Sequence, residues 1–278
     1  MKILLTGRNG QVGYELERAL PALGEVIATD RTQLNLEEVD DVRRVVREVK
    51  PDLIVNAAAY TAVDKAESAR ELAVQVNAVA PGLLGEEAKR LGALLVHYST
   101  DYVFDGEKRT PYREEDAPNP ISHYARSKLE GERAIAASGC RHLILRTSWV
   151  YGPRAANFYQ VILRKAQAGE PMRMVDDQTS VPTTSAFLAA QTLAMLRREA
   201  EGLFHLVPSG YATRYDFACE VVRATGSKSK VAPARTAEFP TPATRPVYSV
   251  MDNRRAGAVL GVRLPHWSDL PPKALPGT

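Results

Sequence analysis

The chain has 278 residues, enough for one large α/β domain or for one domain with a smaller lobe. Hydrophobic residues make up 45% of it and charged residues 25%, with a net charge of +3, a balance typical of an ordinary globular protein. The two cysteines, Cys140 and Cys219, have no metal-type spacing, which argues against a disulfide framework or a zinc site and favours a reducing, cytoplasmic compartment.

The charge is unevenly distributed along the chain. Residues 1–140 hold 18 basic and 23 acidic side chains, whereas residues 141–278 hold 18 and 10. The basic second half favours an anionic ligand, although a solvated basic surface explains it equally well. The basic residues are scattered and not interleaved with aromatics, so we expect no nucleic-acid partner. The first apolar run, Ile3–Leu5, is too short for a signal peptide or a membrane span, so we expect no membrane partner either.

The first 150 residues alternate short apolar runs with amphipathic stretches. Brief, β-branched runs without alternation are typical of buried parallel strands. They occur at Ile3–Thr6, Val26–Thr29, Leu53–Asn56, Leu94–Ser99 and Leu143–Thr147. Helical patterns lie between them at Gln11–Leu23, Leu36–Val49, Leu72–Leu91 and His123–Ser138. This order predicts an α/β fold with a doubly wound parallel (Rossmann) sheet.

After Trp149 the alternation loosens. Helices are predicted at Asn157–Ala168, Ser185–Arg198 and Tyr215–Thr225, a strand at Leu203–Val207, and a Pro-rich stretch at Pro233–Pro246. We therefore expect a nucleotide-binding domain over residues 1–148, completed by about 184–206. Residues 149–183 and 207–278 are expected to form a smaller C-terminal substrate-binding lobe.

Three glycines follow the first predicted strand. Gly7, Gly10 and Gly13 form GxxGxxG where the next helix begins, a pattern that gives a tight turn, a close backbone approach to a pyrophosphate and close helix packing. The free N–H groups of the helix N-terminus favour phosphate. Asp30 ends the second predicted strand, where an acid would bond the adenosine ribose of NAD, while the adjacent Arg31 could bind the 2′-phosphate of NADP. Together the two residues predict that both NADH and NADPH serve. The alternative is that Asp30 and Arg31 only form a surface ion pair.

The candidate catalytic residues are Tyr124, Lys128 and Thr100. Tyr124 and Lys128 are four residues apart on a predicted helix and so share one face. A phenol is a weak acid at neutral pH, and a nearby ammonium would lower its pKa and make it a usable proton donor. Thr100 ends the fourth predicted strand, at the edge where an open α/β sheet binds ligands, and its hydroxyl could bond a ketone oxygen.

Several stretches carry a resemblance to a known family. The chain resembles the extended short-chain dehydrogenases/reductases, and within them the dTDP-4-dehydrorhamnose reductases, from residue 1 to about 255. The stretches are GRNGQVGYEL, VNAAAYTAVDKAE, HYSTDYVFDG, YARSKLEGE, RTSWVYG and PTPATRP. The resemblance implies reduction of the C4 ketone of dTDP-6-deoxy-L-lyxo-4-hexulose to dTDP-L-rhamnose with NAD(P)H, with Tyr124 as proton donor and Lys128 bonded to the nicotinamide ribose.

The resemblance also implies the remaining binding residues. The expected cofactor site comprises Gly7, Gly10, Gln11, Val12, Gly13, Asp30, Arg31, Asn35, Leu36, Ala59, Tyr60, Thr61, Asn77, Tyr98, Tyr124 and Lys128. The expected substrate site comprises Thr100, Asp101, Tyr102, Phe104, Trp149 and Arg245. Arg245 is chosen because a guanidinium suits bidentate phosphate contact, and the alternative is a structural arginine that holds the Pro-rich stretch.

Three other functions remain to be weighed. A related dehydratase carries a glutamate where Tyr102 stands, and a phenol replaces that carboxylate poorly. A nucleotide-sugar epimerase and a non-catalytic NADP-binding subunit of the methionine adenosyltransferase type also resemble the chain. The five histidines show no ligand spacing and are predicted to be structural.

The assembly is expected to be a monomer or a metal-independent homodimer. Some reductases of the family are described as dimers bridged by Mg²⁺ through clustered carboxylates. Glu15 keeps one such acid, but the predicted helix Ser185–Arg198 opens without the glutamate of related chains, and their C-terminal helix with its acid is missing. One carboxylate is too few for the ion, so a role for Mg²⁺ is doubtful.

Overall fold

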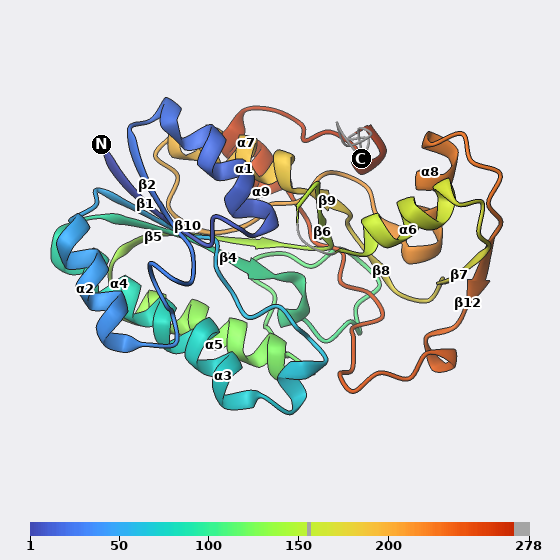
Figure 1. Ribbon diagram of the computed structural model, residues 1–278, viewed down its shortest axis with the longest axis horizontal. Helices are drawn as coiled ribbons and strands as arrows, with labels where there is room; N and C mark the ends of the chain where they lie inside the picture. Colours follow the sequence, from blue (N-terminus) through green and yellow to red (C-terminus); the bar gives the residue numbers. More distant parts are fainter. Residues whose placement is uncertain (155–156, 270–278) are drawn as a thin grey trace.

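The computed structural model describes residues 1–154 and 157–269. A central sheet is covered by helices on both faces, and a smaller lobe extends from one end of it (Figure 1). The last nine residues expected to belong to that lobe, 270–278, lie outside the described residues.

The central sheet confirms the predicted doubly wound topology. Its six strands are parallel and lie in the order β2-β1-β3-β4-β5-β10, so the chain reverses its winding direction between β1 and β3. Their bounds are β1 Lys2–Thr6, β2 Glu25–Thr29, β3 Leu53–Asn56, β4 Leu94–Thr100, β5 Arg141–Thr147 and β10 Gly202–His205. All six carboxyl ends therefore meet at one edge, where ligands bind in such sheets.

Two layers of helices bury the sheet. On one face lie α1 Gln11–Ala19, α7 Ser185–Leu196 and α9 Arg254–Leu260, and on the other α2 Val39–Val49, α4 Ala80–Leu91 and α5 His123–Ser138 (Figure 1). Alternate strand residues point to opposite faces, so neighbours in β1 enter different cores. Leu5 packs with the α1 and α7 side, whereas Leu4 packs with the α2 and α4 side.

The predicted helix Leu72–Leu91 is divided in the structure. It consists of α3 Arg70–Val74, a π-helical turn η3 at Gln75–Val79, and α4 from Ala80. Pro81 lies in the first turn of α4, and because proline has no amide hydrogen, an unbroken α-helix could not pass through it without losing a hydrogen bond. The wider π turn absorbs the interruption.

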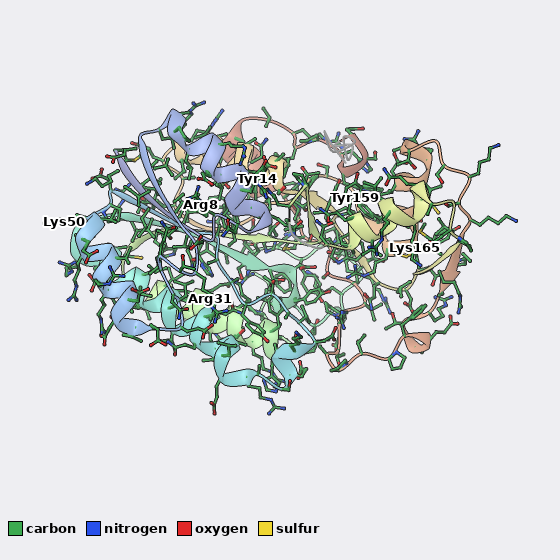
Figure 2. All side chains as sticks on the ribbon, viewed as in Figure 1. Arg8, Tyr14, Arg31, Lys50, Tyr159 and Lys165 are labelled. Carbon is green, nitrogen blue, oxygen red and sulfur yellow. The ribbon has the colours of Figure 1, made fainter. Side chains whose placement is uncertain are left out.

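The lobe has its own aromatic core. Tyr159 of α6 packs with Tyr151 and with Phe217 of α8, and Figure 2 labels Tyr159 on α6. The helices are α6 Phe158–Gln167 and α8 Arg214–Ala224. Three short strand pairs connect the lobe: β6 Val150–Tyr151 with β9 Thr183–Thr184, β8 Thr179–Ser180 with β11 Ala212–Thr213, and β7 Met172–Val175 with β12 Val231–Ala234.

Short helical turns complete the described chain. They are η1 Leu20–Ala22, η2 Lys65–Glu67, η4 Asp101–Val103, η5 Thr236–Glu238 and η6 Trp267–Asp269. Within residues 1–154 and 157–269, none of the helices has the length and apolar character needed to traverse a bilayer.

Candidate active site

A cavity of about 740 Å³ lies at the carboxyl edge of the sheet, between the sheet and the lobe. Its wall comes from the ends of all the strands from β1 to β5, from α5, and from β6, α6 and α8 of the lobe. Most of the predicted site residues line it. They are Gly7, Gly10, Gln11, Val12, Asp30, Arg31, Asn35, Leu36, Ala59, Tyr60, Thr61, Tyr98, Thr100, Asp101, Tyr102, Tyr124, Lys128 and Trp149.

The glycine turn brings backbone close to backbone. Gly7 has φ +74°, a conformation in which a side chain is strained, and a Cβ there would lie 2.8 Å from the Ala58 nitrogen. A Cβ on Gly13 would lie 2.1 Å from the Gly7 carbonyl oxygen. Gly13 does not line the cavity; its lack of a side chain lets α1 pack directly on the turn. The helix N-terminus thus stays exposed to the cavity, as phosphate binding requires.

Asp30 and Arg31 follow β2 directly, and both line the cavity. Asp30 accepts hydrogen bonds from the Thr32 hydroxyl and backbone, and these hold the pKa of its carboxyl below the ordinary value. It is therefore an anion at neutral pH. Arg31 forms an ion pair with Glu37 and is largely exposed; it is labelled in Figure 2. Both members of the predicted cofactor-selecting pair thus face the cavity, and each has its own partner.

Thr100 and Asp101 form a buried hydrogen-bonded pair beside Tyr124 in the cavity wall. Thr100 donates its hydroxyl proton to Asp101 over 3.1 Å and accepts from the Tyr102 backbone N–H over 3.1 Å. Burial raises the pKa of the Tyr124 phenol well above its usual range, and a hydrogen bond with Thr100 offsets this only partly. The sequence predicted a lowered phenol pKa, and the structure gives the opposite direction. The reason is that the phenol is desolvated and Lys128 is not among the groups that shift it.

Lys128 points its ammonium toward the strand below the cavity. Its Nζ donates to the Tyr98 carbonyl over 2.6 Å and lies 3.2 Å from His97 Nε2. The side chain is 2% exposed, and desolvation lowers its pKa to about 8. It nevertheless lines the cavity, so it can reach both the buried strand and a bound ligand.

Asp101 joins the sheet to the lobe. Its Oδ2 accepts from Ser180 of β8 over 2.8 Å and from Ser249 over 2.5 Å. Burial raises the pKa of the carboxyl to about 6 although three hydroxyls stabilise its anion. These hydroxyls donate to both carboxylate oxygens of Asp101. The predicted hydrogen bond from the sugar to Asp101 would therefore be made to an oxygen that already accepts one.

The lobe contributes a cation that the sequence prediction missed. The guanidinium of Arg214, at the start of α8, lies 4.4 Å from the centre of the Trp149 ring and 5.3 Å from that of Phe158. Trp149 lines the cavity and has φ +40°, a strained conformation for a residue other than glycine. Arg214 lines the cavity and also bonds Gln178. The signal available in the sequence was an arginine directly before the predicted helix Tyr215–Thr225, in the basic half.

Four predicted residues do not line the cavity: Gly13, Asn77, Phe104 and Arg245. Asn77 is buried in the π turn, where it bonds both backbone groups of Tyr60, so it fixes a segment of the cavity wall from behind. Phe104 stacks on Tyr112 with ring centres 4.2 Å apart.

Arg245 is engaged inside the Pro-rich stretch. Its guanidinium bonds both carboxylate oxygens of Asp64, at 3.0 and 2.7 Å, and also Thr241 and the Ala243 carbonyl. These contacts match the structural alternative raised from the sequence. The predicted phosphate contact would require these bonds to break.

Two buried hydroxyls in the cavity wall fit a polar ligand. Ser99 Oγ and Thr147 Oγ1 have no hydrogen-bond partner within the described part of the chain, and both residues line the cavity beside Tyr98 and Thr100. A buried hydroxyl without a partner is costly, and a bound amide or hydroxyl would satisfy it. Together with the glycine turn at the other end, they fit a dinucleotide that extends from Gly10 toward Tyr124. Over residues 1–154 and 157–269, no three His, Cys, Asp or Glu side chains form a metal-binding group.

Comparison with known proteins identifies the family. The model of the RmlD substrate-binding domain matches residues 1–275. The chain belongs to that family. A dTDP-4-dehydrorhamnose reductase from Burkholderia thailandensis is 42% identical, with 96% of this chain and 95% of the relative covered.

Solved structures named as dTDP-4-dehydrorhamnose reductases agree with this chain in fold. A dTDP-4-dehydrorhamnose reductase from Clostridium acetobutylicum superposes with a TM-score of 0.92 at 40% identity, covering 97% of this chain and 96% of that one. A reductase of the same name from Bacillus anthracis, solved in complex with NADP, gives a TM-score of 0.92 at 32% identity, with 96% of each chain covered. The extended family expected from the sequence motifs is thus confirmed.

Proposed function

We propose that this protein is a dTDP-4-dehydrorhamnose reductase, an NAD(P)H-dependent oxidoreductase that reduces the C4 ketone of dTDP-6-deoxy-L-lyxo-4-hexulose to dTDP-L-rhamnose. The observation that carries the proposal is that Tyr124, Thr100 and Lys128 meet in the same cavity as the glycine turn, in a chain of this family. The relatives of similar length support the same reaction.

The cofactor supplies a hydride, and the protein supplies a proton and its placement. Tyr124 donates its phenol proton to the substrate oxygen as negative charge develops there. A phenol with a raised pKa remains protonated at neutral pH, so the donor is always loaded, and an alkoxide is basic enough to take its proton. Thr100 lies beside the phenol and would turn its hydroxyl from Asp101 toward the substrate oxygen as charge builds.

The binding residues follow from their places in the cavity wall. The backbone of Gly10, Gln11 and Val12 at the start of α1 would hold the cofactor pyrophosphate, with Asp30 near the adenosine ribose. Lys128 would bond the nicotinamide ribose, and Ser99 and Thr147 would bond polar groups of the nicotinamide end. Excluding water from this end favours hydride transfer over side reactions.

At the lobe side we assign the nucleotide phosphates to Arg214 rather than to Arg245. Arg214 faces the cavity, and a guanidinium held over two aromatic rings keeps its N–H fork available for bidentate phosphate contact. The Trp149 ring would cover the sugar.

The proposed domain division follows the cavity. Residues 1–148 with about 184–206 form the cofactor domain, which contains every strand of the central sheet, and 149–183 with most of the remainder from 207 form the substrate lobe. The helix α9 was expected in that lobe, but it packs on the central sheet and so belongs with the cofactor domain. We propose a cytoplasmic location, in keeping with Cys140 and Cys219, which form no disulfide.

Replacing the proton donor tests the reaction. We expect Tyr124→Phe to lower kcat by about 10²–10⁴ while the Kd for NADPH stays nearly unchanged, because only the transferable proton is removed. The measurement is the loss of cofactor absorbance when the dTDP-4-keto-6-deoxy sugar is supplied with the preceding epimerase. Tyr211→Phe is the matched control, because Tyr211 is 59% exposed in the lobe.

Two results would contradict the proposal. Near-normal turnover by Tyr124→Phe would remove the assigned proton donor. Binding of NADPH by the unaltered protein without any turnover of the keto sugar would instead favour the non-catalytic regulatory alternative.

A further inference from the structure

A chain of buried polar groups leads from Lys128 into the sheet, away from the cavity. Lys128 Nζ lies 3.2 Å from His97 Nε2, and His97 Nδ1 lies 3.1 Å from the side-chain nitrogen of Asn56. Thr6 Oγ1 lies 2.7 Å from Asn56 Oδ1. These four residues come from α5, β4, β3 and β1, and each is at most 2% exposed. No part of this chain is needed for the mechanism above except Lys128.

The direction of the hydrogen bonds in this chain is fixed at its far end. The backbone N–H of Ala58 donates to Thr6 Oγ1 over 3.3 Å, and Thr6 donates its own proton to Asn56 Oδ1. The side-chain nitrogen of Asn56 therefore faces His97 Nδ1, and because an amide nitrogen only donates, Nδ1 must accept. A neutral imidazole that accepts at Nδ1 carries its proton on Nε2.

Turning the Asn56 amide round would be costly. Thr6 Oγ1 would then receive donors from both Ala58 and Asn56, and its own hydroxyl proton would lose the acceptor that now takes it. A buried hydroxyl proton without an acceptor costs about 1–3 kcal/mol. His97 itself stays neutral, because burial and the charge of Lys128 hold its pKa well below the usual value.

We propose that His97 is a positioning residue for Lys128: through the Nε2–H tautomer imposed by Asn56 and Thr6, it favours the neutral amine of Lys128 over the ammonium. The ammonium form of Lys128 can only donate hydrogen bonds, so its N–H groups repel the Nε2–H of His97. The neutral amine has a lone pair that accepts a hydrogen bond from this Nε2–H. His97 thereby makes Lys128 a stronger acid than burial alone would.

The other groups around Lys128 set the balance. Tyr98 presents its carbonyl, which accepts a proton from either form, while its hydroxyl points away to Thr192. Glu132, one turn along α5, favours the ammonium, but its carboxylate is paired with Arg146 of β5. Desolvation is the main cause that lowers the pKa of Lys128 to about 8, and the Nε2–H of His97 is expected to lower it further. In a reductase that needs the ammonium, kcat/KM falls as the pH rises through this value.

The tautomer can be measured without turnover. In the cofactor-free protein labelled with ¹⁵N-histidine, the two ring nitrogens of His97 should appear as protonated Nε2 and unprotonated Nδ1 near pH 7.5, and His97→Gln assigns the signal by its loss. A proton on Nδ1, or on both nitrogens, overturns the proposal. This result does not depend on the proposed reductase activity, so the two can fail separately.

The pH profile gives the second readout. His97→Gln can turn its carbonyl oxygen toward Lys128, so we expect the alkaline limb of kcat/KM to move up by roughly 0.5–1 pH unit. His142→Gln is the matched control, because His142 lies on β5 and bonds the Cys140 carbonyl instead. An unchanged or lowered limb in His97→Gln overturns the proposal. A variant that merely weakened the fold would lower the melting temperature and leave the limb in place.

Discussion

We propose that Asp30 sets the preference of the protein between NADH and NADPH. Its carboxylate lines the cavity and is held ionised by Thr32, so it would repel a 2′-phosphate. Arg31 is its attractive counterpart, but an ion pair with Glu37 already occupies that guanidinium. The balance predicts that both cofactors serve.

Removing the acid should shift that balance. We expect Asp30→Ala to raise the ratio of kcat/KM for NADPH to that for NADH by about fivefold, because it removes the repulsion between the carboxylate and the 2′-phosphate. Steady-state kinetics with each cofactor measures the ratio, and Asp40→Ala, an exposed acid on α2, is the control. An unmoved ratio would mean that Asp30 does not face the ribose.

At the residue scale, sequence spacing located most of the cavity wall but not the partners of each side chain. The glycine turn and Tyr124 with Lys128 could be placed because local periodicity fixes them relative to a strand end or a helix face. Arg245 could not be distinguished from Arg214, because the choice depends on where Asp64 lies in space, 181 positions from Arg245 along the chain. The predicted direction of the Tyr124 pKa shift was wrong for the same reason, because burial depends on the tertiary structure.

Among the elements, the Pro-rich stretch is tied to the loop after β3 through Arg245 and Asp64. The ion pair lowers the pKa of Asp64, so its stabilising effect is present above the unfolded value near 4 and is lost as the pH falls below it. Asp64 is 39% exposed, and solvent screening limits the contribution to about 1 kcal/mol.

The two arginines of the lobe should therefore respond differently to the same substitution. We expect Arg214→Met to raise KM for the sugar nucleotide by about 10-fold or more, since a charge-assisted bond to phosphate contributes about 1.5–3 kcal/mol. Arg245→Met should lower Tm by a few degrees and change KM less than Arg214→Met does. Thermal melting and steady-state kinetics on both variants measure this. A large rise in KM for Arg245→Met with an unchanged Tm would restore the phosphate role first predicted for it.

The long central elements were predictable from their period, and the interruptions were not. The strands of the sheet have continuous apolar runs, whereas the π turn depends on how Pro81 is accommodated once α4 packs against α5. The helix α9 was missed because its seven residues are too few to show a period. The pairing of β7 with β12 joins segments more than 50 residues apart, which no local pattern records.

Across the whole molecule, the basic second half does not translate into one basic binding surface. Several of its arginines pair on the surface with acids of the same half, among them Arg173 with Glu238 and Arg223 with Glu220. Arg214 is the basic residue of this half that lines the cavity with described contacts to Trp149 and Phe158. The excess of basic residues predicted an anionic ligand. In our proposal, one guanidinium, that of Arg214, binds the phosphates of this ligand.

Assembly is the last property that the chain's own residues allow us to predict. A bridging Mg²⁺ needs several oxygen ligands in near-octahedral geometry. Glu15 lies on α1, beside α7, but α7 contains no acidic residue to join it. Within the described ranges no three acids, histidines or cysteines gather. We therefore expect the sedimentation coefficient to be the same with EDTA and with added Mg²⁺, whether the protein is a monomer or a dimer. Dissociation on chelation, reversed by Mg²⁺, would show that a partner chain completes the ligand set around Glu15.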